Sequence, residues 1–377
     1  MAPIRVGLIG LSGAAPENYE GTSWAANAHL PFLQASPHFE IVALLNSSVE
    51  SAQAAIRKYG LPSETKAYGD PNDLAADSTV DLVVASVRVD RHFLVVRPSI
   101  IAGKTVFVEW PLERNLQVAK EMAALAAKHK AKTIVGIQGA FSPLVRKMKE
   151  IVENGVLGQV LSSTLLGALT NAGATESKNV RYLLDREVGG NVMSIHAGHT
   201  IEFFTAVLGE FKTFDSACTI TLPTKDIVDR SAGNKVIVKA ARNTVPDQVR
   251  FWGTVEPSNA AVTVLLHAGP GIPGLPTCEW RIQGTKGWLR LTSAGLTLNF
   301  GNPVFKLEHF DTERNTVEEL VPDTDEWDSL PLPARNIARL YEAYRKDEWY
   351  PDFEWGVKRH ELIEQMWKRF DETYGKD

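Results

Sequence analysis

The first 140 residues alternate between short apolar runs and helix-like segments, and this alternation restricts the fold more than any other feature of the chain. Runs rich in β-branched residues, typical of buried parallel strands, lie at 4–10, 39–45, 81–86, 105–109 and 133–137. Helical spacing and end signals predict helices between them, at 24–33, 48–59, 91–102 and 113–130. Alternating strands and helices predict an α/β domain with a doubly wound parallel sheet that is covered on both faces.

Beyond Pro143 the pattern changes to strands with few helices between them. After one helix at 144–154, strand-like runs lie at 160–166, 213–221, 235–240, 248–255, 260–267, 278–283 and 288–291. Consecutive strands without crossovers favour an α+β C-terminal domain with a large, mainly antiparallel sheet. We therefore expect domains at 1–140 and 141–377. The final helices, near 333–346 and 355–373, are candidates to pack back on the first domain.

Composition excludes several classes of protein. The 377 residues are too many for one ordinary core, and a formal net charge of −5 argues against a broad electrostatic contact with nucleic acid or anionic lipid. No apolar run approaches the ~20 residues that span a bilayer, and no secretory leader is evident. Two cysteines, Cys218 and Cys278, cannot make a disulfide framework. We expect a cytoplasmic protein, with a nuclear location as the alternative, and no membrane or direct nucleic-acid partner.

The end of the first predicted strand has the glycines of a dinucleotide site. Gly7, Gly10 and Gly13 lie where a backbone approaches a diphosphate, and the next helix would offer unpaired N–H groups. The fingerprint is imperfect, because residues 13–20 read as an insertion before the helix resumes near Trp24. In the alternative interpretation the glycines only relieve a tight turn.

The residues after the second predicted strand bear on the choice of cofactor. An Asp or Glu there would bind the ribose 2′-hydroxyl and repel a 2′-phosphate, but the chain has Asn46, Ser47 and Ser48. These neutral side chains tolerate a phosphate, so we expect NADP(H) rather than NAD(H). The alternative is that Ser47 or Ser48 only caps the next helix.

Several motifs, in order over about 290 residues, carry a resemblance to a known family. They are Ile4 to Ser12, His29-Leu30-Pro31, His92, Gly103 to Glu109, Gln138 to Pro143, Gly155 to Gly158, Gly198 to Glu202 and Ile282 to Gly287. The chain resembles the glucose-fructose oxidoreductase and inositol dehydrogenase (Gfo/Idh/MocA) family, and within it the fungal branch of galactose-pathway repressors. The resemblance implies a Rossmann domain that binds a nicotinamide dinucleotide.

The chain departs from the family at two catalytic positions. Family enzymes resemble one another in a Glu-Lys-Pro turn whose lysine acts near the reacting carbonyl; here the turn is Glu109-Trp110-Pro111. An indole has no titratable proton, although it can stack on a nicotinamide. Catalytic members also carry an Asp four residues before a His on one helix face; here Ile195 replaces the Asp and His199 remains.

Three residues are the candidates for proton transfer. His199 is the first, because imidazole titrates near neutrality; the alternative is a hydrogen-bonded histidine between the domains. His196, three residues earlier, and Tyr182 are the others, each with packing as the alternative interpretation. We expect no metal site, since a third ligand is not evident.

The strand ends and the family resemblance together predict the cofactor contacts. These are Gly10, Leu11, Ser12, Trp24, Asn46, Ser47, Ser48, Ser86, Val87, Arg88, His92, Glu109, Trp110, Pro111 and Gln138. Arg88 has an alternative role as the ion-pair partner of Asp90 or Glu109.

The sequence leaves three functions open. The first is an NAD(P)-dependent oxidoreductase, with NADP(H) preferred, that acts on a small or medium carbonyl, imine or alcohol. The second, implied by the resemblance, is a catalytically silent NADP(H)-binding transcriptional co-regulator with a protein partner. The third is a non-redox enzyme on the same scaffold. In each case we expect a homodimer formed through the C-terminal sheet, because an exposed apolar sheet face is unfavourable.

Overall fold

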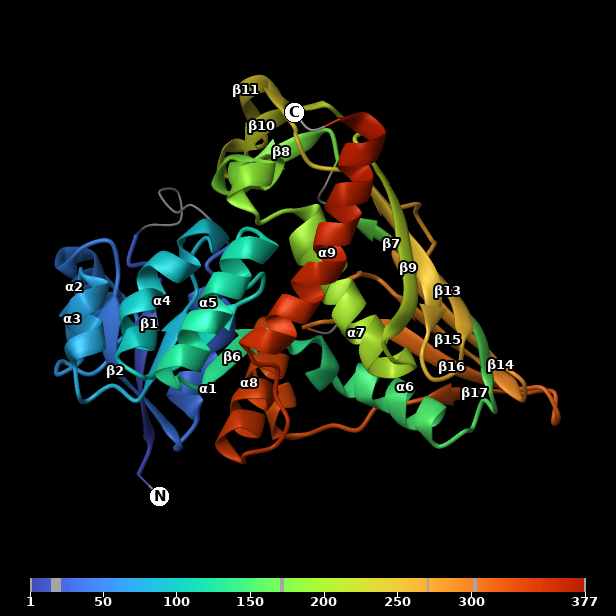
Figure 1. Cartoon of the computed structure of the whole chain (residues 1–377), viewed down its shortest axis with the longest axis horizontal. Helices are drawn as coiled ribbons and strands as arrows, with labels where there is room; N and C mark the ends of the chain where they lie inside the picture. Colours follow the sequence, from blue (N-terminus) through green and yellow to red (C-terminus); the bar gives the residue numbers. More distant parts are fainter. Residues whose placement is uncertain (1, 15–21, 170–172, 270, 301–303, 376–377) are drawn as a thin grey trace. The chain divides into compact units, whose positions relative to one another are not determined.

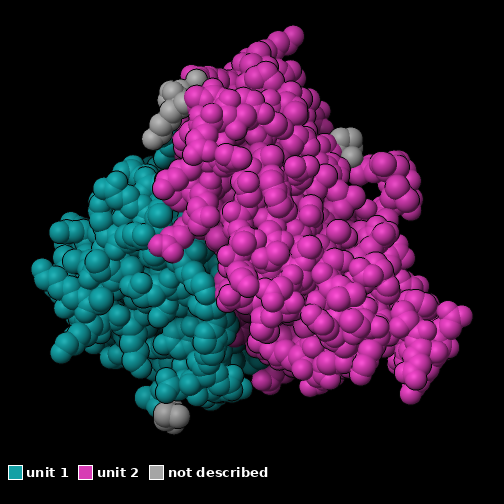
Figure 2. Space-filling model, turned by 45° about the vertical axis from the view of Figure 1, so that its right-hand side comes forward, with its two compact units in different colours: residues 1–137, 187–190, 327–360 teal, residues 138–186, 191–326, 361–377 magenta. Residues whose placement is uncertain are grey.

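The computed structural model describes residues 2–14, 22–169, 173–269, 271–300 and 304–375. The chain divides into two compact units, coloured separately in Figure 2. Unit 1 comprises residues 1–137, 187–190 and 327–360, and unit 2 comprises residues 138–186, 191–326 and 361–377. The first unit therefore consists of the N-terminal part of the chain and a late segment near its C-terminus.

Unit 1 contains a six-stranded parallel sheet with the order β3-β2-β1-β4-β5-β6 (Figure 1). The strands are β1 (Ile4–Ile9), β2 (Phe39–Leu45), β3 (Lys66–Tyr68), β4 (Leu82–Ala85), β5 (Thr105–Glu109) and β6 (Thr133–Gly136). The helices are η2 (Ala25–His29), α1 (Leu30–Ala35), α2 (Val49–Lys58), α3 (Pro71–Ala76), η3 (Val89–Arg91), α4 (His92–Ile101), α5 (Leu116–His129) and α8 (Leu332–Arg345). The predicted doubly wound sheet is confirmed. Its strand order reverses between β1 and β4, the place where such sheets bind ligands.

Three details of unit 1 differ from the prediction. The helix expected at 24–33 is a π-turn, η2, continued by α1, and α5 begins at Leu116 rather than at 113. The elements β3 and α3 were not predicted, because three and six residues are too few to show a periodic pattern.

Unit 2 contains an eight-stranded sheet and a three-stranded sheet. The large sheet has the order β17-β16-β15-β14-β7-β13-β12-β9 and is antiparallel except between β7 and β13, so the predicted mainly antiparallel sheet is confirmed. Its strands are β7 (Val160–Leu169), β9 (Phe211–Thr219), β12 (Gln248–Val255), β13 (Ala260–Ala268), β14 (Cys278–Gly284), β15 (Gly287–Ser293), β16 (Phe305–Asp311) and β17 (Thr316–Leu320). The small sheet, not predicted in this form, has β8 (Thr175–Ser177), β10 (Thr224–Asp229) and β11 (Lys235–Arg242) in the order β11-β10-β8.

The remaining helices surround these two sheets in sequence. They are η4 (Gln138–Phe141), α6 (Pro143–Glu153), η5 (Lys178–Leu184), η6 (Arg186–Val188), η7 (Val192–Ala197), α7 (Gly198–Leu208), η8 (Arg230–Ala232), η9 (Glu326–Ser329) and α9 (Phe353–Tyr374). Within the described ranges, no helix combines the length and the apolar character that a membrane crossing requires.

Helix α7 is held on the large sheet by aromatic packing. The rings of Phe203 and Phe204 lie 5.8 and 5.2 Å from the indole of Trp280 on β14. Trp280 is fully buried, and its Nε1 donates a hydrogen bond to Ser163 Oγ at 2.9 Å. Because this anchor lies one turn after His199, it fixes the part of the helix that carries the candidate histidine.

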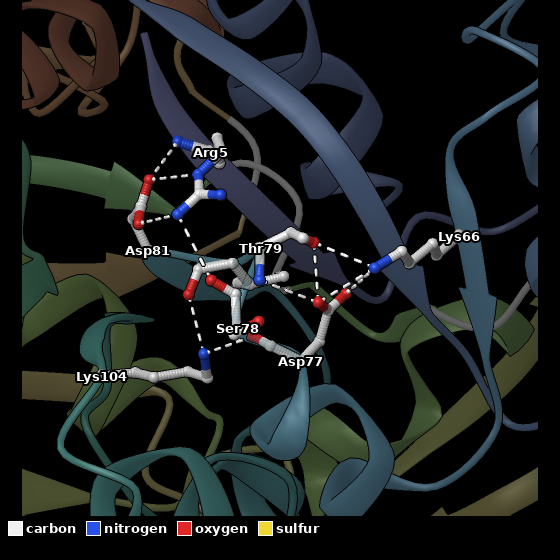
Figure 3. A network of polar contacts seen from close by, with 8 residues as sticks. Arg5, Lys66, Asp77, Ser78, Thr79, Asp81 and Lys104 are labelled. Carbon is white, nitrogen blue, oxygen red and sulfur yellow. Dashed lines mark hydrogen bonds and ion pairs between the residues drawn. The ribbon is translucent and has the colours of Figure 1, made fainter. Parts of the chain in front are cut away.

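Charged residues tie together the amino ends of the parallel strands (Figure 3). Arg5 of β1 donates to both carboxylate oxygens of Asp81, just before β4, at 2.7 and 2.9 Å. The Lys66 ammonium donates to Asp77, and the Lys104 ammonium donates to the Asp77 carbonyl at 2.6 Å. These contacts order the edge of the sheet opposite to its carboxyl ends, where ligands bind in such folds.

Three histidines are buried and deprotonated. Burial lowers the pKa of His196 to about 4 and that of His199 to about 3, the charge of His196 adding to the second shift. Burial also lowers the pKa of His360 in α9 to about 3, with a further contribution from His92. An imidazolium at these positions would lose its hydration, so the neutral ring is the stable form.

We predict that the protein loses stability as pH falls from about 6.5, the pKa of an unfolded histidine, toward 4. In that window the unfolded chain binds protons that the folded chain does not, so the free energy of unfolding decreases with acidification. Urea unfolding at several pH values measures this slope. Each buried histidine accounts for up to about 1.4 kcal/mol per pH unit. His199→Gln should lower the slope, whereas His38→Gln, at an exposed site, should not. Equal slopes in both variants would contradict the assignment.

Candidate dinucleotide site

Gly10 makes the turn at the end of β1. Its φ is +96°, and a Cβ there would lie 2.3 Å from the Ser86 carbonyl oxygen and 2.8 Å from Val87 Cγ1. No side chain fits in that space, so only glycine permits β1 to turn directly against the end of β4. The structure thus brings the predicted residues Gly10, Ser86 and Val87 together at the carboxyl edge of the sheet.

The turn after Gly10 presents unused hydrogen-bond donors. Within the described part of the chain, the backbone N–H groups of Leu11, Ser12 and Gly13 donate to no protein acceptor. Consecutive free N–H groups in a glycine turn form a cradle for an anion such as a diphosphate. The residues present therefore fit a dinucleotide. Residues 15–20 of the expected insertion lie outside the described residues.

Asn46 supports this turn from below. Its side-chain Nδ2 donates to the Leu11 carbonyl at 2.8 Å, and the Tyr59 hydroxyl donates to the Ser12 carbonyl at 3.2 Å. The amide of Asn46, which we expected to contact the cofactor ribose or phosphate, is thus used to hold the turn.

Ser47 and Ser48 have different roles at the start of α2. Ser48 caps the helix, accepting a hydrogen bond from the Ser51 N–H at 3.2 Å, as in the alternative interpretation. Ser47 is exposed. The sequence argument missed Glu50, an exposed carboxylate in the first turn, whose pKa is lowered by a backbone N–H and by the Ser48 hydroxyl. Position in the first helical turn was the available signal.

Two further predicted residues have protein partners. Arg88 binds Asp90 through two hydrogen bonds of 2.7 and 2.8 Å, which confirms that alternative role. His92 is 1% exposed, and its ring nitrogens lie 3.2 Å from the Leu112 carbonyl and 3.1 Å from the Val87 carbonyl. His92 therefore links the end of β4 to the turn after β5.

Trp110 does not have the role that we expected. The residue is only 5% exposed, and its indole packs on His360 with ring centroids 4.7 Å apart. A buried indole in contact with α9 is not open for stacking on a nicotinamide. Pro111 follows it through a cis peptide bond. The turn residue that replaces the family's lysine therefore acts as packing in unit 1.

Glu109, at the end of β5, belongs to a buried hydrogen-bonded chain. Its Oε1 lies 2.8 Å from His29 Nε2, and His29 Nδ1 lies 2.8 Å from the Tyr341 hydroxyl. The carboxylate lies over Gly136, where a Cβ would be 2.6 Å from its atoms. His29 appeared in the sequence only as part of a motif, and Tyr341, 312 residues away, gave no signal.

Gln138 follows β6 and has an unusual environment. Its side chain is fully buried, and in the described residues neither the amide nitrogen nor the amide oxygen has a hydrogen-bond partner. Leaving both groups unpaired costs several kcal/mol in total, on the order of 1–3 for each, so the site fits a polar ligand group or water. Trp24 stands directly before η2, at the start of the helical segment that follows the turn.

His196 and His199 lie in unit 2, on either side of the junction between η7 and α7. Asn191 begins this segment with a capping box to Ser194, which orders the chain around both histidines. His199 Nδ1 is buried without a partner among the described residues. We expected an imidazole that titrates near neutrality, and this is wrong for the structure, because burial lowers the pKa of His199 to about 3.

A pocket in unit 2 contains charged residues that the sequence analysis missed. Its lining includes His196, Glu176 of β8 and Lys225 of β10. Burial raises the pKa of Glu176 and lowers that of Lys225, and the attraction between the two opposes both shifts. Tyr182 lies in η5 directly before Leu183, which lines the pocket, and is half-buried. Only the folding of η7 beside the small sheet brings these residues together.

Comparison with known proteins agrees with this architecture. Residues 4–137 match the oxidoreductase family with an NAD-binding Rossmann fold, and residues 143–293 match the C-terminal domain of Gal80p. The chain is 32% identical to dehydrogenase aclE of Aspergillus oryzae over 84% of each protein. It is 30% identical to the galactose/lactose metabolism regulatory protein GAL80 of Saccharomyces cerevisiae, over 77% of this chain and 67% of that protein.

A solved structure extends the similarity to the whole chain. The crystal structure of a super-repressor mutant of Gal80p from Saccharomyces cerevisiae matches with a TM-score of 0.86 at 26% identity, and the match covers 100% of this chain and 98% of that one. The chain therefore belongs to the oxidoreductase family with an NAD-binding Rossmann fold, the Gfo/Idh/MocA family, in its fungal branch with a Gal80-like C-terminal domain.

Proposed function

We propose that the protein is an NAD(P)-dependent oxidoreductase that transfers hydride to or from a small or medium carbonyl, imine or alcohol. The observation that carries the proposal is the row of free N–H groups at Leu11, Ser12 and Gly13, next to the crowded glycine turn. A turn of this kind is suited to a diphosphate. The relative from Aspergillus oryzae, a dehydrogenase, supports a redox role.

The chemistry falls to His199 in this proposal. A bound nicotinamide would supply or accept the hydride. Because burial lowers the pKa of His199 to about 3, the ring is neutral and acts as a hydrogen-bond donor to the substrate oxygen rather than as a titrating acid. Trp110 and Ile195 bring no proton to the site. His196 and Tyr182 remain secondary candidates.

The second candidate is a catalytically silent co-regulator that binds NADP(H) and a protein partner. Two observations favour it: Trp110 is buried against His360, and Ile195 stands at the aspartate position. The relative from Saccharomyces cerevisiae is a regulatory protein. A non-redox enzyme on the same scaffold is the third candidate. We place the enzyme in the cytoplasm and a co-regulator in the nucleus.

We predict that purified protein oxidises NADPH in the presence of a carbonyl panel and that His199→Ala slows turnover by ~100-fold. His199→Gln, which keeps an N–H donor, should retain more of the rate than His199→Ala. Between pH 5 and 8 the rate should show no inflection from His199, because its pKa is about 3. His38→Ala, at an exposed position, is the control. Unchanged turnover in His199→Ala would remove this role, and tight NADPH binding without turnover would favour the co-regulator.

We propose NADP(H) as the preferred cofactor, because residues 46–48 carry no acid. Ser47→Asp should then increase the ratio of the NADPH to the NADH dissociation constant by about tenfold, since a carboxylate repels the 2′-phosphate. Fluorescence titration measures both constants. Ser63→Asp adds the same charge at an exposed position beyond α2 and should leave the ratio unchanged. A wild-type preference for NADH would contradict the proposal, and Glu50 would then be the responsible acid.

We propose a homodimer formed through the large sheet. Leu166 of β7 and Trp288 of β15 are 46% and 37% exposed, on a face that a second copy would cover. The protein should elute in sizing chromatography at twice the mass of one chain. Leu166→Glu should shift it toward the monomer, whereas Leu94→Glu, on exposed α4 of unit 1, should not. Elution of the wild type as a monomer would contradict this assembly.

A further inference from the structure

The hydrogen-bonded chain of Tyr341, His29 and Glu109 lies inside unit 1. His29 and Tyr341 have 0% exposure, and the Glu109 side chain keeps 10%. Both contacts to the imidazole measure 2.8 Å. The carboxylate is therefore the member of the chain that a ligand can reach.

Aromatic rings pack around the two buried members. The Tyr341 ring stacks on Phe32 at 5.1 Å and contacts Phe39 and Phe107 at 5.3 and 5.0 Å. Phe107 also meets the His29 ring edge-on at 5.2 Å. Water has little access to such a site, so the proton positions are set by the three residues themselves.

The partners determine the tautomer of His29. A carboxylate can only accept hydrogen bonds, so the Nε2 nitrogen that faces Glu109 must carry the proton. Neutral imidazole then has a lone pair on Nδ1, which needs a donor, and the Tyr341 hydroxyl lies there. Burial raises the pKa of Tyr341 well above its usual value, with the Glu109 charge contributing, and this keeps the hydroxyl proton in place.

Glu109 ends β5 at the carboxyl edge of the sheet. It pairs in register with Gly136, and the preceding residue Val108 pairs with Ala85 of β4. Ser86, the next residue after Ala85, is the one that Gly10 touches. The carboxylate therefore stands on the strand beside the one that receives the glycine turn.

We propose that Tyr341 is a positioning residue for the dinucleotide site: its hydroxyl fixes the His29 tautomer that donates to Glu109, and so holds this carboxylate ready to accept a hydrogen bond from the bound ligand. The inference rests on the proposed function for the identity of the ligand. Without the hydroxyl, the His29 proton is free to move to Nδ1, and Nε2 then no longer offers a proton to Glu109.

The first experiment reads the tautomer directly. Nitrogen chemical shifts of the His29 ring, assigned through its proximity to Phe107, distinguish protonation at Nε2 from protonation at Nδ1. In the wild type we expect the proton on Nε2. In Tyr341→Phe, which keeps the ring packing, we expect the Nδ1-protonated form to appear. Tyr344→Phe makes the same change one turn along α8, where the hydroxyl lies 3.5 Å from Thr105, and should leave the shifts unchanged.

The second experiment measures the consequence for binding. Tyr341→Phe should weaken NADPH binding by about fivefold, the value of one net hydrogen bond, while Tyr344→Phe should not. If Tyr341 acts through Glu109, the same substitution should have no further effect in a Glu109→Gln background. A tyrosine that only stabilises the core would weaken binding equally in both backgrounds.

The outcomes separate this inference from the proposed function. An unchanged His29 tautomer in Tyr341→Phe overturns the inference, whatever the wild type binds. A changed tautomer with unchanged NADPH affinity, or additive effects with Glu109→Gln, overturns the positioning role. A wild type that keeps the expected tautomer but does not bind NADPH refutes the proposed function, and with it the positioning of a dinucleotide.

Discussion

The close approach of Gly10 to the end of β4 is the constraint on which the candidate site depends. A Cβ at this position would lie 2.3 Å from the Ser86 carbonyl, so any other residue would force two neighbouring strand ends apart. The turn that results leaves the N–H groups of Leu11, Ser12 and Gly13 without protein acceptors in the described residues. The same steric requirement thus shapes the sheet edge and creates its anion-binding character.

The chemistry of the site is less typical of the family than its architecture. Trp110 occupies the position of the family's lysine and is buried against His360, and Ile195 occupies the position of the aspartate. His199 remains, but burial keeps it neutral. A neutral imidazole stabilises a developing negative charge by donating a hydrogen bond, and it does not provide a proton of its own. The enzyme and the co-regulator would therefore share a dinucleotide site and differ in whether hydride transfer occurs after the cofactor has bound.

The late segment of the chain is an integral part of the first unit. Residues 327–360 belong to that unit, and α8 contributes Tyr341 to the aromatic cluster around His29. Burial of these rings supplies a large hydrophobic contribution, while the polar atoms of Tyr341, His29 and Glu109 satisfy one another. A chain that ended before α8 would leave His29 Nδ1 without its donor in an apolar environment.

Periodicity alone predicted the doubly wound sheet and the mainly antiparallel one, because both patterns depend on local alternation of apolar residues. The motif residues also indicated Gly10, Ser86 and Glu109 correctly as residues of one sheet edge. The short elements β3, α3 and β8 escaped detection, since too few residues carry their pattern. Tertiary structure alone decided that Trp110 is buried, that Asn46 supports the turn, and that His29 meets Tyr341 across 312 residues. Such contacts depend on distance in space, and a linear sequence contains that distance only through the fold.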